Sequence, residues 1–261
     1  MASPIAGALD DGRHPGTIEE WVFAAWTDDG LTGVLSGHRI VGPTAWYWAA
    51  LARRGRQLLH ITDFHVPVRA DPFIVKGEAM WAEHFRDARM EQWSIGNETY
   101  AAALDEPDEA LDRAYGVPTP IAFDLEWYAT SPALALTGAD LAADAGYEQL
   151  GVVHGRVEIL GEDPLDLTEV PGRRWHRWST DPAPSPAWPA TGRLTDSPPT
   201  RDSSDVAAPS AHRASVVGPL RLPIVAAHTG VRAPFAFPDG SVLDLVLTPS
   251  GWARRPDRAR R

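Results

Sequence analysis

IAFDLEWY, residues 121–128, alternates cleanly between apolar and polar side chains. Successive side chains of a β-strand point to opposite faces, so the aromatic and aliphatic residues of this segment lie on one face and Asp124 and Glu126 lie on the other. The segment therefore predicts a β-strand with one apolar and one polar face.

Strand patterns continue on both sides of this segment, interrupted by Gly, Pro and Asp. Further strands are expected at residues 20–23, 31–40, 45–51, 57–68, 73–85, 90–104, 147–160, 172–178, 231–237 and 242–247. The tripeptides Asp28-Asp29-Gly30 and Pro238-Asp239-Gly240 predict hairpin turns. Helix signals are confined to 105–114 and 141–145. Many short strands separated by turns predict an all-β sandwich or barrel.

The composition excludes several classes of function. The 261 residues carry 24 Lys and Arg against 35 Asp and Glu, a formal charge of −11. This acidic balance argues against a nucleic-acid partner, which requires a basic surface. The absence of cysteine excludes disulfides, thiol catalysis and thiolate metal sites.

No targeting or membrane segment is expected. Residues 1–16 lack the basic and apolar parts of a signal peptide. The most apolar segment, 45–52, is much shorter than the roughly 20 residues that span a bilayer. These features predict a cytoplasmic protein without a transmembrane segment.

Cofactor and metal motifs are also missing. Motifs for nucleotide phosphates, serine hydrolases and zinc proteases are absent from the sequence, so no cofactor is expected. His60 and His65 are close in sequence, but side chains five residues apart on a strand point to opposite faces. They are not expected to share an ion, and no metal is predicted.

Asp124 and Glu126 are candidate catalytic acids. Residues two apart on a strand project from one face about 7 Å apart. If that face lined a barrel interior, one carboxyl would stay protonated and serve as a general acid. The alternative is a solvated strand face opposite the apolar one.

Two neighbouring strand segments interleave tryptophan with polar residues. Trp81 and His84 belong to the first, and Trp93 and Glu98 belong to the second. With Trp127 they predict an apolar pocket that carries a few fixed polar groups; the alternative is a plain core with a polar exterior. On a regular strand Trp127 points away from the two carboxylates of its own segment, so all of these groups line one pocket only if a bulge intervenes.

GRRWHRW, residues 172–178, places Arg174, His176 and Trp178 on one face of an extended chain. An arginine beside a histidine lowers the pKa of the imidazole, so His176 is a candidate base and Arg174 a candidate orienting group. The alternative is an arginine stacked on tryptophan at a seam between domains.

GVVHGRV at 151–157, the segment 172–178 and DLEW at 124–127 together resemble the hydroxyneurosporene synthase (carotenoid hydratase) family, which is similar to tocopherol-cyclase-like proteins. The resemblance covers about residues 18–178 and resumes near 220–252. It implies an all-β fold of two lipocalin-like antiparallel halves packed side by side.

The resemblance further implies a cofactor-independent hydratase, isomerase or cyclase that acts on an apolar isoprenoid, lipid or polyketide. In that scheme Asp124 or Glu126 protonates an alkene, and His176 and Arg174 act as base and orienting group. The implied ligand-binding residues are Trp81, His84, Trp93, Glu98, Trp127 and Trp178.

The expected domains are 17–135 and 146–253. Residues 181–213 hold seven prolines and few apolar side chains, which predicts a mobile loop inside the second domain. Residues 254–261 form a basic, proline-broken tail that is expected to be flexible.

Three functions stay open at this point: the enzyme, a non-catalytic lipocalin-like carrier of an apolar small molecule, and a β scaffold that binds a partner. Carboxyl groups with raised pKa in a dry cavity would favour the enzyme. A cavity without them would favour the carrier, and a filled interior would favour the scaffold.

Overall fold

The computed structural model describes residues 10–14, 16–136, 145–180, 231–249 and 251–255. Antiparallel strands dominate these residues, which confirms the all-β fold class. The strands of the large sheet are β1 (Ile18–Trp26), β2 (Thr32–Val41), β3 (Thr44–Arg53), β4 (Leu58–Pro67), β5 (Ile74–Lys76), β6 (Met80–Ala88), β7 (Gln92–Leu104), β8 (Val117–Ala129), β9 (Leu134–Ala135), β10 (Ala145–Ile159) and β11 (Leu165–Ser179).

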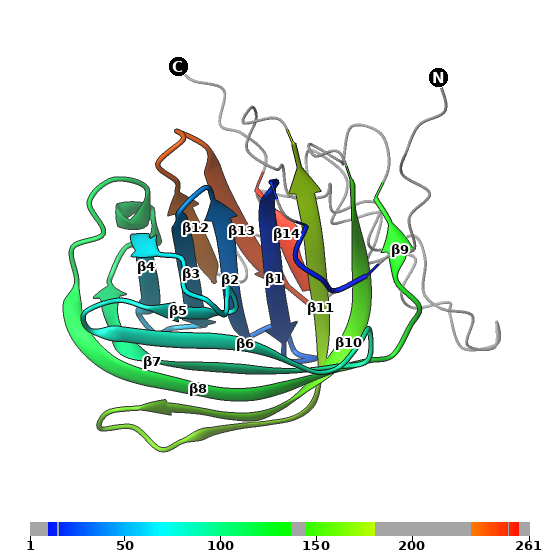
Figure 1. The fold of residues 1–261 in the computed structure, drawn as a ribbon. Helices are drawn as coiled ribbons and strands as arrows, with labels where there is room; N and C mark the ends of the chain where they lie inside the picture. The colour runs from blue at the N-terminus through cyan, green and yellow to red at the C-terminus, as the bar shows by residue number, and fades with distance from the viewer. Residues whose placement is uncertain (1–9, 15, 137–144, 181–230, 250, 256–261) are drawn as a thin grey trace, which may run out of the picture.

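The large sheet curls into a ring (Figure 1). Its strand order is β4-β3-β2-β1-β11-β10-β8-β7-β6-β5, and β4 also pairs with β7. That closing pair is short, because it joins only residues 58–60 to residues 102–104. Along residues 92–99 the same edge of β7 pairs with β6 instead, so β4 and the β5–β6 hairpin diverge from a common neighbour.

A second sheet lies behind β1, β2 and β3 in Figure 1. It consists of β12 (Arg232–Ala236), β13 (Val242–Thr248) and β14 (Gly251–Arg254). The expected Pro238-Asp239-Gly240 turn joins its first two strands, with Gly240 at a φ of 80° that suits glycine.

The second sheet explains why β1, β2 and β3 are buried on both faces. Trp21 and Phe23 of β1 belong to the core inside the ring. Val22 and Trp26 belong to a separate core between the ring and the second sheet. Because alternate residues of one strand serve two different cores, these strands have nearly continuous apolar sequences.

The one or two helical turns expected within 105–114 are present as a short 3-10 helix, η1 (Pro107–Leu111). Its single buried side chain is Ala110, so it lacks the apolar stripe that would hold a longer helix against the sheet. β11 begins at Leu165, earlier than the expected 172, because it pairs with β10 along nearly its whole length.

Strands from both expected domains share the large sheet. β8 pairs with β10, and β1 pairs with β11, so hydrogen bonds cross the expected boundary near residues 135–146. The loop at 181–213 lies outside the described residues, as do residues 256–261 of the tail and residues 141–144 of the second expected helix. Among the described residues, no helix is long and apolar enough to cross a membrane.

Candidate functional site

Aromatic side chains occupy the interior of the ring. Trp21, Tyr47, Trp93 and Trp127 are all fully buried there. The tryptophans predicted at 93 and 127 therefore face the same interior, directly opposite one another on β7 and β8.

Polar and charged groups are gathered where the N-terminal segment meets this interior. In Figure 1 the segment before β1 crosses in front of β11 towards β10. Asp11 in this segment is fully buried and accepts hydrogen bonds from Tyr147 and from Arg174, the latter at 2.6 Å. The group, called the Glu19 cluster below, comprises Asp10, Asp11, Arg13, His14, Glu19, Tyr147, Arg174 and His176.

Glu19 is the centre of this cluster. Its Oε1 atom lies 2.7 Å from His14 Nδ1 and 2.7 Å from His176 Nε2. Its Oε2 atom accepts hydrogen bonds from the Arg13 guanidinium at 2.5 Å and from the His14 backbone N–H at 2.8 Å. Burial would raise the pKa of Glu19, but the hydrogen bonds from His176 and His14 outweigh it, so this pKa is lowered and the carboxyl is ionised.

The His176 ring contacts Trp21, the Asp10 backbone and Glu19. Its ring stacks on Trp21 with centroids 4.8 Å apart, and its Nδ1 atom lies 3.0 Å from the Asp10 carbonyl oxygen. Burial lowers the pKa of His176, the Glu19 carboxylate opposes this shift, and the charge of Arg174 adds a smaller lowering. The expected direction is confirmed, although burial contributes more to it than the arginine does.

Arg174 is packed among aromatic rings. Its guanidinium carbon lies 5.0 Å from the ring centroids of Trp127 and Tyr147 and 5.7 Å from that of Trp93. It also donates hydrogen bonds to Gln149 Oε1. Arg174 thus shares a strand face with His176, as expected, and its guanidinium also lies over the rings of Trp93 and Trp127.

A second polar group crosses the same interior. His38 Nδ1 and His84 Nδ1 are 2.8 Å apart, and His84 Nε2 lies 2.8 Å from Ser36 Oγ. Ser36 in turn contacts the Tyr47 hydroxyl, which accepts a hydrogen bond from Asn97. Burial lowers the pKa of His38 to about 3 and that of His84 well below its usual range, so both rings are neutral.

The structure divides the predicted site residues into two sets. His84, Trp93, Trp127, Arg174 and His176 face the interior, and Trp178 lies next to it, with its ring centroid 4.8 Å from that of His176. The remaining members lie on the outer side of the sheet or in solvent; they are Asp124, Glu126, Glu98 and the half-buried Trp81.

The expected pairing of Asp124 or Glu126 with His176 in one pocket is therefore corrected. The regular alternation of β8 turns Phe123, Leu125 and Trp127 inward, and the two carboxylates outward into solvent. No bulge separates Asp124 from Trp127 in the register of β8 with β7, so the two faces are not exchanged.

Sequence reasoning missed several members of the Glu19 cluster, among them Asp11, His14 and Glu19 itself. Asp11 and His14 lie before the first strand, in a segment without any motif. Glu19 offered one signal: two consecutive glutamates open the apolar run EEWVFAAW, and an acid inside a buried strand requires a partner.

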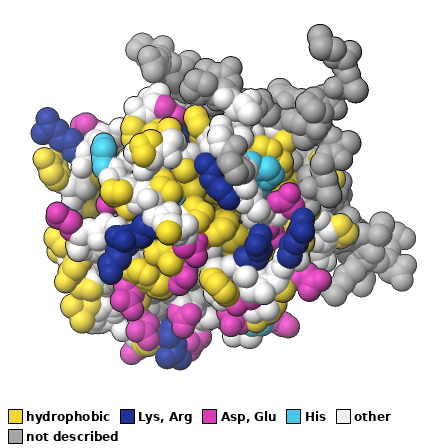
Figure 2. Space-filling view, viewed as in Figure 1, with side chains coloured by type: hydrophobic (Ala, Val, Ile, Leu, Met, Phe, Trp, Pro, Cys, Tyr) yellow, Lys and Arg dark blue, Asp and Glu magenta, His cyan; other side chains and the backbone are white. Residues whose placement is uncertain are grey.

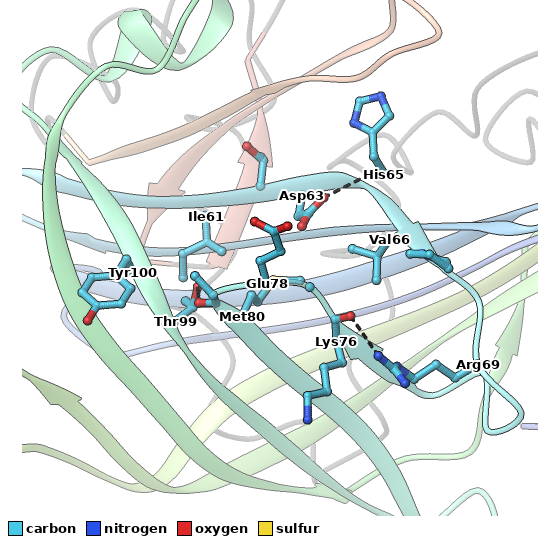
Figure 3. Close-up of a pocket in the computed structure, with 14 residues that line it drawn as sticks. Ile61, Asp63, His65, Val66, Arg69, Lys76, Glu78, Met80, Thr99 and Tyr100 are labelled. Atoms are coloured by element: carbon cyan, nitrogen blue, oxygen red, sulfur yellow. Dashed lines mark hydrogen bonds between the residues drawn. The ribbon is translucent and has the colours of Figure 1, made fainter.

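A groove runs along the divergence between β4 and the β5–β6 hairpin (Figure 3). Its volume is about 710 Å³. Ile61, Val66 and Met80, which line it, belong to the core inside the ring. The polar and charged lining residues are Thr62, Asp63, His65, Arg69, Lys76, Glu78, Thr99 and Tyr100.

Comparison with known proteins gives no match: no family model, no curated protein and no solved structure matches the chain. The resemblance to the hydroxyneurosporene synthase family stays a prediction.

Proposed function

We propose that the protein binds an amphiphilic small molecule in the groove between β4 and the β5–β6 hairpin, as a carrier with a lipocalin-like binding mode. The observation that carries this proposal is the groove itself, whose floor is continuous with the apolar core at Ile61, Val66 and Met80. A concave site with an apolar floor and a few polar groups is the usual form of a small-molecule site.

The ends of the groove differ in chemistry. Tyr100, 61% exposed, and Thr99 lie at one end in Figure 3, and Arg69 lies near the other. The Arg69 guanidinium donates to the Lys76 carbonyl oxygen at 3.4 Å, which brings two cationic residues close together. Figure 2, viewed as in Figure 1, shows hydrophobic side chains near the centre of that face, with basic and acidic side chains around them.

This arrangement favours an apolar tail with an anionic head group. The tail would cover Ile61, Val66 and Met80, and the head group would lie near Arg69 and Lys76. The buried carboxyl groups of Asp11 and Glu19 have lowered pKa values, because hydrogen bonds and nearby positive charges outweigh the effect of burial. Ionised acids of this kind do not protonate an alkene, so the carrier is favoured over the hydratase.

The test uses titration calorimetry to compare the affinity of the protein for dodecanoate with its affinity for dodecan-1-ol, which lacks the anionic head group. Wild-type protein is expected to bind dodecanoate, and Ala79→Trp, which places a large ring at the exposed groove mouth, is expected to weaken binding at least tenfold. Val242→Trp adds the same ring to an exposed position on the second sheet and is the matched control. Equal binding by wild type and Ala79→Trp, or no binding by wild type, would overturn the proposal.

A second candidate function is cofactor-independent acid–base catalysis on the same class of ligand, as hydratase or isomerase. The observation that favours it is the His176–Glu19 hydrogen bond at 2.7 Å next to the tryptophan-lined interior. Mass spectrometry of an isoprenoid alkene recovered after incubation tests it. Addition of one water by wild type, and not by His176→Gln, would favour the enzyme; an unchanged alkene would favour the carrier.

A further inference from the structure

The side chains of His14, Glu19 and His176 converge from three separate parts of the chain: the N-terminal segment, β1 and β11. Their ligand atoms all lie within 4.8 Å of one another. Glu19 and His176 are fully buried, and the side chain of His14 is 28% exposed. The group is thus held in the fold on one side and reachable from solvent on the other.

The ring nitrogens of this group face oxygens that only accept hydrogen bonds. His176 Nδ1 lies 3.0 Å from the Asp10 carbonyl oxygen, and His176 Nε2 and His14 Nδ1 each lie 2.7 Å from Glu19 Oε1. Three N–H protons, or a cation in place of the protons between the nitrogens and Oε1, satisfy these contacts.

A cation between the nitrogens and Oε1 is consistent with the outer contacts of both ligands. The Asp10 carbonyl is the kind of outer partner that fixes the tautomer of a metal-binding histidine: Nδ1–H donates to it and the Nε2 lone pair is left for the metal. Arg13 donates to the other oxygen of the carboxylate, Oε2, and so leaves Oε1 available.

The local charges also accommodate a divalent cation. The neighbouring acids Asp10, Asp11 and Glu19 exceed the neighbouring cations Arg13 and Arg174 by one formal charge, with the imidazoles left out of the count. Tetrahedral ligand atoms about 2.1 Å from a metal are about 3.4 Å apart, so the present 2.7 Å separations would widen by about 0.7 Å on binding.

We propose that His14 Nδ1, Glu19 Oε1 and His176 Nε2 form a binding site for a transition-metal dication of the zinc type. Two imidazoles and one carboxylate suit Zn²⁺ and its neighbours, whereas Ca²⁺ and Mg²⁺ require more oxygen ligands. Three protein ligands leave a further coordination position on the exposed side of His14. The site is separate from the groove proposed above and does not depend on it.

The test is a titration of the full, tag-free, chelator-treated chain with Zn²⁺ alone, followed by calorimetry. Wild-type protein is expected to bind one Zn²⁺ per chain, and His14→Ala is expected to bind it at least tenfold more weakly. His14→Ala is the primary variant because it leaves the buried Glu19–His176 contact in place. His65→Ala, which removes an exposed histidine elsewhere, is the matched control and is expected to bind like wild type.

A spectroscopic measurement accompanies the titration. Co²⁺ in a low-coordinate site of this donor set absorbs visible light, and this absorption is expected in wild type and lost in His14→Ala. Equal Zn²⁺ affinities of wild type and His14→Ala would overturn the proposal. No binding by wild type, or an equal loss in His65→Ala, would also overturn it, with circular dichroism confirming that each variant is folded.

Discussion

Glu19 and Glu20 are neighbours in β1, but they lie in two different regions of the molecule. Glu19 faces the ring interior, where its carboxylate contacts two histidines and Arg13. Glu20 faces the outer core, where it accepts hydrogen bonds from Arg39 at 2.6 and 2.9 Å and from Arg177. The alternation of a β-strand alone separates them.

Glu20 forms a buried ion group with Arg39 and Arg177. The Arg39 guanidinium lies 5.0 to 5.8 Å from the rings of Trp46, Trp48 and Phe237, and it is 3.3 Å from Asp239 of the second sheet. Burial would raise the pKa of Glu20, but the charges of Arg177 and Arg39 outweigh it and lower this pKa. The ion group therefore joins the ring to the second sheet.

The comparison distinguishes Glu20, whose arginine partners keep their charges, from Glu19, whose histidine partners can exchange protons or bind a metal. Arginine does not lose its proton in proteins, so the charges around Glu20 are permanent. Histidine can gain or lose a proton or accept a metal, so the partners of Glu19 can change. Both acids are fully buried, and the chemistry of their partners, not their burial, distinguishes them.

The largest expected effect is that of Glu20→Gln. Removing the carboxylate takes away the charge that Arg39 and Arg177 share in the outer core, and breaking a buried ion group of this kind costs about 3–5 kcal/mol. The free energy of unfolding in denaturant measures it.

Glu19→Gln is the matched comparison and is expected to cost less, about 1.5–3 kcal/mol, the usual value of hydrogen bonds to a charged group. Burial lowers the pKa of its partner His176, so the substitution leaves no buried imidazolium without a counter-charge there. Glu98→Gln, at an exposed position, is the control and is expected to change stability by less than about 0.5 kcal/mol. A larger loss for Glu19→Gln than for Glu20→Gln would reverse the comparison.

An intermediate effect on the pH dependence of stability is expected from His60, whose imidazole is buried in the outer core. Its ring stacks on Phe235 with centroids 4.7 Å apart, and burial lowers its pKa from 6.5 to about 4. The unfolded chain therefore binds more protons below pH 6.5, and stability falls as the pH drops from 6.5 to 4, by about 3 kcal/mol from this residue.

His60→Leu is expected to lose that part of the pH dependence, measured as the free energy of unfolding at pH 6.5 and pH 4. His65→Leu, which replaces an exposed histidine on the same strand, should keep the wild-type dependence. Identical pH profiles for His60→Leu and wild type would show that the outer core does not hold His60 neutral.

The smallest effect is expected at Asp124 and Glu126, which lie on the solvent side of β8. The double variant Asp124→Asn, Glu126→Gln is expected to change the free energy of unfolding by less than about 0.5 kcal/mol and to bind dodecanoate like wild type. A tenfold loss of dodecanoate binding would show that these carboxylates belong to the functional site.

Local sequence patterns predicted most strands and both hairpin turns, because alternation and turn residues act over a few neighbouring positions. They also predicted correctly that Arg174 and His176 share a face with Trp178. At 105–114 the pattern predicted one or two helical turns, and the structure has a short 3-10 helix there that buries only Ala110.

Period-two spacing by itself determined which residues of each strand share a face; it did not determine which face is inside. On β8 the apolar face turned inward, whereas β1 to β3 bury both faces because β12–β14, from far along the chain, cover the outer one. Pairing of β1 with β11 likewise brought Glu19 to His176, 157 residues away. Such contacts depend on long-range strand pairing, whose register is set by the assembled cores and not by neighbouring residues.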